Sequence, residues 1–192
     1  MPESPKILAF AGSAREASFN KRMIRIAVDG AREAGAEVTL VDLKEYPLPL
    51  FDQDEEAAYG LPPNARKLKD LFLSHQGLLI ASPEYNSSIS PLLKNTIDWV
   101  SRPVEGQQQL AEYAGKTAVI MSASPGALGG LRGLVHVRAI LGNIGVVVLP
   151  ATLSISGAPK AFADDGTLAD PKQHAQVRSL GRTLAEHLAR LG

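Results

Sequence analysis

The sequence contains no cysteine among its 192 residues. This absence excludes disulfide bonds, thiolate chemistry and zinc or iron–sulfur centres held by cysteine. Lysine plus arginine and aspartate plus glutamate both number 20, so the formal net charge is zero. A general nucleic-acid-binding protein normally carries a basic excess, so the charge balance argues against that class. A neutral chain also lacks the charge repulsion that opposes self-association.

Long hydrophobic runs are also missing. No apolar run approaches the roughly 20 residues that a membrane-spanning helix needs. The opening MPESPKILAFAG is too briefly apolar for the hydrophobic segment of a signal peptide, because an Arg-bearing loop follows at once. We therefore expect a cytoplasmic protein without a membrane partner. Hydrophobic residues make up 45% of the chain, which permits a substantial core, and the length favours one domain over residues 1–192.

What the chain does contain is an alternation of apolar runs with amphipathic segments. The apolar and β-branched runs predict strands at 6–11, 37–43, 77–82, 116–122 and 145–149. Helical periodicity and capping residues predict helices at 19–34, 64–75, 91–100, 132–142 and from 171 onward. Long loops are predicted at 44–62 and 150–170.

Five alternating strand–helix units predict an α/β fold with a parallel sheet that helices cover on both faces. Right-handed crossovers then favour the flavodoxin-like strand order 2-1-3-4-5 in a three-layer sandwich. Ligands of such folds bind beyond the carboxyl ends of the strands, where the strand order reverses. The loops to examine are therefore 12–18, 83–90 and 123–131, which follow the first, third and fourth strands.

The first of these loops carries groups that suit a phosphate. Ser13 and Ser18 offer hydroxyls, Asn20 an amide and Arg15 a planar guanidinium, directly before a predicted helix. Lys21 and Arg22 fall in the first helical turn, where the helix dipole disfavours cations and a bound anion would relieve the conflict. The loop has neither Gly-Lys-Ser/Thr nor G-x-G-x-x-G, so it is not a common nucleotide signature. The alternative is an ordinary serine helix cap beside a surface arginine.

The second loop opens with Pro83-Glu84-Tyr85-Asn86. Proline restricts the turn, Tyr85 could offer an aromatic face to a planar ligand, and Asn86 could contact its heteroatoms. A proline turn with a half-buried tyrosine would leave the same pattern. Because this loop and the first one follow neighbouring strands, we expect them to lie side by side at one edge of the sheet, which favours a shared binding site.

The segment 91–100 has apolar side chains on two stripes, one of which includes Trp99. A helix that is apolar on two sides needs a second surface to bury. We expect that surface to be another subunit, with Trp99 as the anchor. The alternative is that the helix lies beneath the long 44–62 loop.

Together, GSAREASFN and SPEYNSSISPLLKNTIDW resemble the NAD(P)H-dependent FMN reductase family and its quinone, azo-dye and chromate reductase relatives. The resemblance implies a flavodoxin-like fold that binds FMN without a covalent bond, and a homodimer or homotetramer. It implies a cofactor site formed by Ser13, Arg15, Ser18, Phe19, Asn20, Pro83, Glu84, Tyr85, Asn86, Ser124 and Gly126.

The same resemblance implies the reaction. Hydride from NADPH or NADH would pass to the flavin and then to quinone, azo, flavin or metal-oxyanion acceptors by a ping-pong mechanism. Because the flavin carries the chemistry, we assign no catalytic side chain and no metal. Two alternatives stay open: a flavodoxin-type electron carrier without substrate turnover, and a nucleotide-binding module that takes up no flavin.

Overall fold

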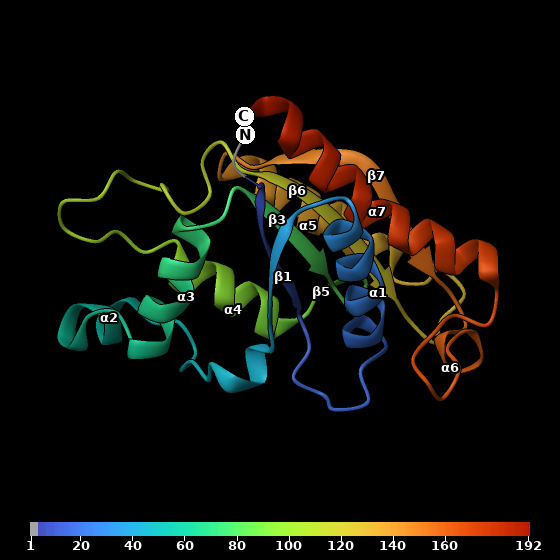
Figure 1. Cartoon of the computed structure of the whole chain (residues 1–192). Coiled ribbons are helices and arrows are strands. Elements are labelled where there is room, and N and C mark those ends of the chain that lie inside the picture. Colours follow the sequence, from blue (N-terminus) through green and yellow to red (C-terminus); the bar gives the residue numbers. More distant parts are fainter. Residues whose placement is uncertain (1–3) are drawn as a thin grey trace.

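The computed structural model describes residues 4–192, and its centre is a five-stranded parallel sheet (Figure 1). The order along the sheet is β2-β1-β3-β6-β7. These strands are β1 (Lys6–Ala11), β2 (Glu37–Val41), β3 (Gly77–Ala81), β6 (Thr117–Ala123) and β7 (Val147–Ile155). Counting only strands of this sheet, the order is 2-1-3-4-5, so the predicted fold class is confirmed.

Helices cover both faces of the sheet, which gives three layers (Figure 1). On one face lie α1 (Phe19–Glu33) and α7 (Pro171–Leu191). On the other lie α3 (Pro63–Leu73), α4 (Pro91–Val100) and α5 (Leu131–Asn143). Every residue of β3 and β6 is buried, which explains why these strands are apolar without alternation. Within residues 4–192, no helix has the length and apolar composition needed to cross a membrane.

The backbones of α1 and α7 touch at two glycines. A β-carbon built on Gly30 would lie 2.0 Å from the carbonyl oxygen of Arg178, and one on Gly181 would lie 1.8 Å from that of Ala27. Real β-carbons do not approach other atoms so closely. Only glycine therefore allows the two helices to lie at this distance.

The segment 44–62, predicted as a loop, contains two short helices. These are the 3-10 helix η1 (Leu43–Glu45) and α2 (Gln53–Tyr59). α2 buries none of its residues, and its first turn is capped by Asp52, which accepts hydrogen bonds from the N–H groups of Asp54 and Glu55. A polar helix without a buried face shows no apolar periodicity, which is why the sequence pattern did not reveal it.

The loop predicted at 150–170 is also partly wrong, because β7 continues through Pro150 to Ile155 and is followed by α6 (Ala158–Ala161). The predicted strand 145–149 ends directly before this proline. β7 is an edge strand, however, and its register with β6 shifts between Ala118 and Ile120. Edge strands and bulges are the places where a sheet tolerates proline.

A separate two-stranded hairpin follows β3. Its strands, β4 (Glu84–Tyr85) and β5 (Ser88–Ile89), pair only with each other. Asn86 and Ser87 form the turn with φ values of 50° and 67°. Positive φ at both turn positions matches the twist of a two-residue hairpin loop.

Candidate functional site

The loops after β1, β3 and β6 meet at the carboxyl edge of the sheet. The Ser90 hydroxyl, at the start of α4, donates to the carbonyl of Gly12 at 2.6 Å. The Asn20 amide, at the start of α1, exchanges two hydrogen bonds with the backbone of Ala123 at the end of β6, at 2.9 and 3.0 Å. The prediction that the first two loops lie side by side is therefore confirmed.

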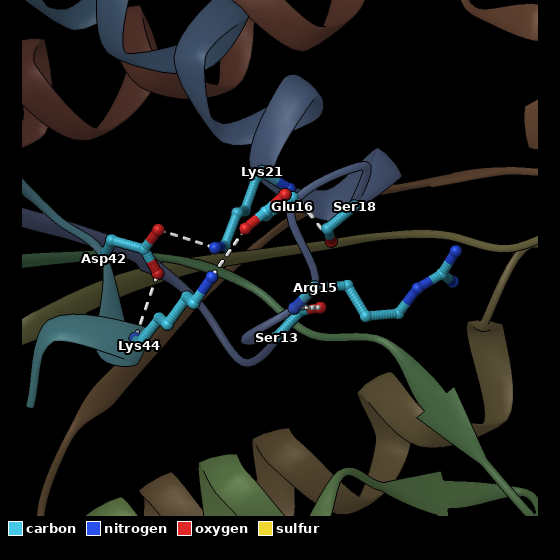
Figure 2. A network of polar contacts seen from close by, with 7 residues as sticks. All are labelled: Ser13, Arg15, Glu16, Ser18, Lys21, Asp42 and Lys44. Carbon is cyan, nitrogen blue, oxygen red and sulfur yellow. Dashed lines mark hydrogen bonds and ion pairs between the residues drawn. The ribbon is translucent and has the colours of Figure 1, made fainter. Parts of the chain in front are cut away.

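The first loop presents two buried serines at the start of α1 (Figure 2). The Ser18 hydroxyl accepts from the N–H of Lys21, and the Ser13 hydroxyl accepts from the N–H of Arg15, each at 3.4 Å. A hydroxyl that accepts a bond can still donate its own hydrogen. Both serines thus hold the loop in shape and remain donors for a ligand.

Arg15 is the open cation of this loop. Its side chain is exposed, and within residues 4–192 its guanidinium has no ion-pair or hydrogen-bond partner. In Figure 2 it extends away from the other labelled side chains. The first turn of α1 contains no acidic residue. Hydroxyls, a free guanidinium and helix N–H groups form a donor set that fits a phosphate group.

Lys21 does not need a bound anion, because its ammonium group forms an ion pair with Asp42 at 2.6 Å (Figure 2). Burial opposes ionisation of Asp42, but hydrogen bonds from the Lys21 side chain and the Lys44 backbone outweigh it, so the pKa of this carboxyl lies below its usual value. Lys44 in turn pairs with Glu16 of the loop at 2.7 Å. The argument for an anion therefore fails for Lys21. Its partner, Asp42, directly follows β2 at the same edge of the sheet, and the local sequence around Lys21 does not reveal this pair. For Arg22 the argument is not contradicted, because within residues 4–192 its guanidinium meets the Ala163 carbonyl and the Phe19 ring but no acid.

Two further residues of the predicted site use their side chains inside the fold. Both amide atoms of Asn20 are bonded to the backbone of Ala123, so its side chain is held against the end of β6. Phe19 stacks on Phe162 with 5.7 Å between ring centroids and 25° between planes. The resemblance implied only the backbone around Phe19, so this contact does not affect that expectation. The Asn20 side chain was expected at the phosphate, and its intramolecular partner lies 103 positions away along the chain.

The hairpin after β3 presents Tyr85 and Asn86 to solvent, with Tyr85 48% exposed, whereas Pro83 is buried. The Glu84 side chain points to α5. One of its carboxylate oxygens accepts two hydrogen bonds from Arg132, at 2.7 and 3.1 Å, and the other accepts one from the N–H of Gly133 at 3.0 Å. Desolvation raises the pKa of Glu84, but these bonds from Gly133 and Arg132 lower it more, so the net shift is downward.

The loop after β6 is fixed where it leaves the strand. The N–H of Ser124 donates to Ile155 at 3.0 Å, and its carbonyl accepts from Ala158 at 3.1 Å. Its hydroxyl accepts from the N–H of Gly126 at 3.2 Å, and Gly126 is exposed. Both residues therefore lie at the same edge as the other two loops. Within residues 4–192, no three His, Asp or Glu side chains gather as metal ligands would.

Trp99 is not available to a partner subunit. It is 1% exposed, its indole N–H donates to the Pro49 carbonyl at 2.8 Å, and Phe51 packs edge-on at 5.0 Å. The prediction that Trp99 anchors an oligomer is therefore wrong. The alternative is the correct one, since α4 lies beneath the 44–62 segment.

Comparison with known proteins decides the family. A family model described as NADPH-dependent FMN reductase matches residues 5–160. The chain belongs to this family. The predicted family, the oxidoreductase class, and FMN with a nicotinamide nucleotide as co-substrate are thereby confirmed.

Relatives match over most of the chain. An NAD(P)H-dependent FMN reductase of Pseudomonas aeruginosa is 33% identical over 192 residues, covering 100% of this chain and 99% of the relative. An NADPH:quinone oxidoreductase of Arabidopsis thaliana is 32% identical over 191 residues, covering 97% and 93%. Among solved structures, the flavoenzyme NAD(P)H:(acceptor) oxidoreductase of Paracoccus denitrificans superimposes with a TM-score of 0.78 at 24% identity, covering 97% and 98%. That last likeness concerns the fold alone.

Proposed function

We propose that this FMN reductase family member moves electrons from NADPH or NADH to quinone, azo, flavin or metal-oxyanion acceptors by a ping-pong mechanism. FMN, when bound, supplies the hydride and electron chemistry. The observation that carries the proposal is the uncommitted donor set of Ser13, Arg15 and Ser18, at the same edge of the sheet as the hairpin with the half-exposed Tyr85. The names of the relatives, which include quinone oxidoreductases, support the acceptor class.

At the phosphate end, we assign binding to the hydroxyls of Ser13 and Ser18, the guanidinium of Arg15, and the backbone N–H groups of Phe19 and Asn20. A guanidinium can bond two phosphate oxygens at once, and the start of α1 adds its partial positive charge. The Asn20 side chain contributes indirectly, because it ties the start of α1 to the end of β6.

At the ring end, we assign Pro83, Tyr85 and Asn86 to the edge of the isoalloxazine, with Ser124 and Gly126 lining the same site. Tyr85 offers an aromatic surface, and Asn86 offers polar atoms on an exposed turn. One open face would then serve the nicotinamide and the acceptor in turn, which is the basis for the ping-pong mechanism. A ternary complex in steady-state kinetics would contradict it.

We further propose one domain over residues 1–192, a cytoplasmic location and self-association as a homodimer or homotetramer. The zero net charge supports self-association, because it leaves no repulsion between copies. Light scattering of the purified protein measures the mass, and a monomer at all concentrations would contradict the oligomer.

The substitution Arg15→Ala tests the phosphate assignment. We expect FMN affinity to fall about 10- to 100-fold, since a hydrogen bond to a charged group contributes about 1.5–3 kcal/mol. The unfolding midpoint of the apoprotein should stay unchanged, because the Arg15 side chain has no partner within residues 4–192. Arg25→Ala is the matched control, since it removes another exposed arginine, which belongs to α1.

Titration of FMN fluorescence measures both variants. Equal affinity in Arg15→Ala and wild type would refute the assignment. A protein that takes up FMN but oxidises neither NADPH nor NADH in the presence of quinones, azo dyes, flavin and chromate would refute the proposed enzyme and favour an electron carrier.

A further inference from the structure

The hairpin that carries Tyr85 and Asn86 is not part of the main sheet. β4 and β5 pair only with each other, and two turn residues separate them. A lone two-stranded hairpin is marginally stable in water. Whatever sets the position of Tyr85 must therefore come from contacts between the hairpin and its neighbours.

Those contacts lead to the start of α5. The Glu84 carboxylate bonds the Arg132 guanidinium at 2.7 and 3.1 Å and the Gly133 N–H at 3.0 Å. His136, one turn further along, bonds the Ser88 hydroxyl at 2.8 Å through Nδ1. A β-carbon on Gly133 would meet the Ser88 carbonyl at 3.2 Å, so helix and hairpin also pack closely.

Glu84 also completes the helix that it contacts. Gly130 is the N-cap residue of α5, has φ of 92°, and provides no side-chain hydrogen bond to the first turn. The free N–H groups at a helix start favour an anion. Glu84, 49 positions away from Gly133 along the chain, supplies that anion from the hairpin. One carboxylate thus joins the hairpin to the end of the loop after β6, where α5 begins.

We propose that Glu84 is a positioning residue, whose bonds to Arg132 and Gly133 fix Tyr85 and Asn86 of the hairpin relative to the loop after β6. This inference rests on the proposed function, and it assigns Glu84 no contact with FMN. The carboxylate is committed to α5 by three hydrogen bonds. The resemblance implies a place for Glu84 in the segment against the flavin, and the inference gives its side chain a different task, which is to hold that segment on α5.

Breaking the contact of Glu84 with Arg132 and Gly133 should make the hairpin more mobile and leave the phosphate-binding loop unchanged. In Glu84→Gln and in Arg132→Met, we expect kcat/KM for a benzoquinone acceptor to fall about 10-fold, since small misplacements of reacting groups cost rate steeply. FMN affinity should stay within about threefold, because Arg15 and the two serines are untouched. The visible absorption of bound FMN should shift, and amide hydrogens of residues 84–89 should exchange faster.

Three further proteins sharpen the test. Asp98→Asn removes an exposed ion pair with Lys94 from α4 and serves as the control with unchanged kinetics. The double variant Glu84→Gln/Arg132→Met should be no worse than the poorer single variant, because both substitutions break one contact. Arg132→Lys keeps the charge and should recover part of kcat/KM.

The outcomes separate cleanly. If both single variants match Asp98→Asn in kcat/KM, in absorption and in hydrogen exchange, the inference is overturned while the proposed function stands. If FMN affinity falls in step with activity, Glu84 belongs to the binding surface and the inference is again overturned. A wild-type protein that takes up no FMN overturns the proposed function, and the inference with it.

Discussion

Replacing Gly181 by alanine is expected to force α7 away from α1. The new β-carbon would lie 1.8 Å from the carbonyl oxygen of Ala27, far inside the 3.4 Å at which ordinary van der Waals contact begins. The atom it meets belongs to the backbone and cannot rotate aside. The buried contact between α1 and α7 would therefore have to open along its length.

Two terms of opposite sign set the magnitude. Overpacking a close interface costs typically 1–3 kcal/mol, and a rigid backbone obstacle places this site at the upper end. Alanine regains roughly 1 kcal/mol of helix propensity over glycine. We expect the free energy of unfolding to fall by about 2 kcal/mol, which lowers Tm by roughly 4–8 °C for a chain of this size.

Urea unfolding of the apoprotein, followed by far-ultraviolet circular dichroism, measures the change without a contribution from FMN binding. Gly142→Ala is the matched control, because Gly142 also lies in a helix and a β-carbon there has no atom within 4 Å. It should raise stability by up to about 1 kcal/mol. If Gly181→Ala is as stable as Gly142→Ala, the close approach of the two helices does not limit packing and the reasoning is refuted.

Three other substitutions test the remaining structure. Lys69→Met leaves the Glu112 carboxylate without its buried partner, which lies at 2.9 Å. The free energy of unfolding, measured in urea, should fall by about 3–5 kcal/mol. The double variant Lys69→Met/Glu112→Leu should recover part of this loss, because it also removes the unpaired carboxylate. Trp99→Phe loses the indole bond to Pro49 and should cost about 1 kcal/mol, while the mass measured by light scattering stays unchanged. Because folding lowers the pKa of Asp42, its contribution is present above the unfolded value and lost as pH falls. The stability difference between wild type and Asp42→Asn should therefore persist at neutral pH, begin to shrink as the pH falls to about 4, and vanish only below the lowered pKa of the folded state.

The sheet and its binding edge could be predicted because their signals are local. Buried parallel strands read as short apolar runs, and the handedness of crossovers restricts how such runs can be ordered. The loops that follow neighbouring strands must then lie together. The contact between Ser90 and Gly12 is a direct consequence of that rule.

The partners of polar side chains could not be predicted in the same way. Asn20 at the start of a helix has the same local sequence whether it faces a phosphate or, as here, a backbone 103 positions away. The same holds for Trp99, whose partner Pro49 lies 50 positions earlier. Local patterns identify which residues can bind, and tertiary contacts decide which of them are still free.

The close contact of α1 with α7 at Gly30 and Gly181 makes one part of the binding edge less tolerant of sequence change than another. Because α1 carries the phosphate loop at its start and touches α7 through backbone atoms, its placement tolerates few changes of sequence. The hairpin on the other side of the edge is joined to α5 largely by side chains, which can be exchanged one at a time. During evolution, substitutions in the hairpin can therefore change the residues beside the flavin ring while the phosphate loop, and with it FMN binding, stays the same.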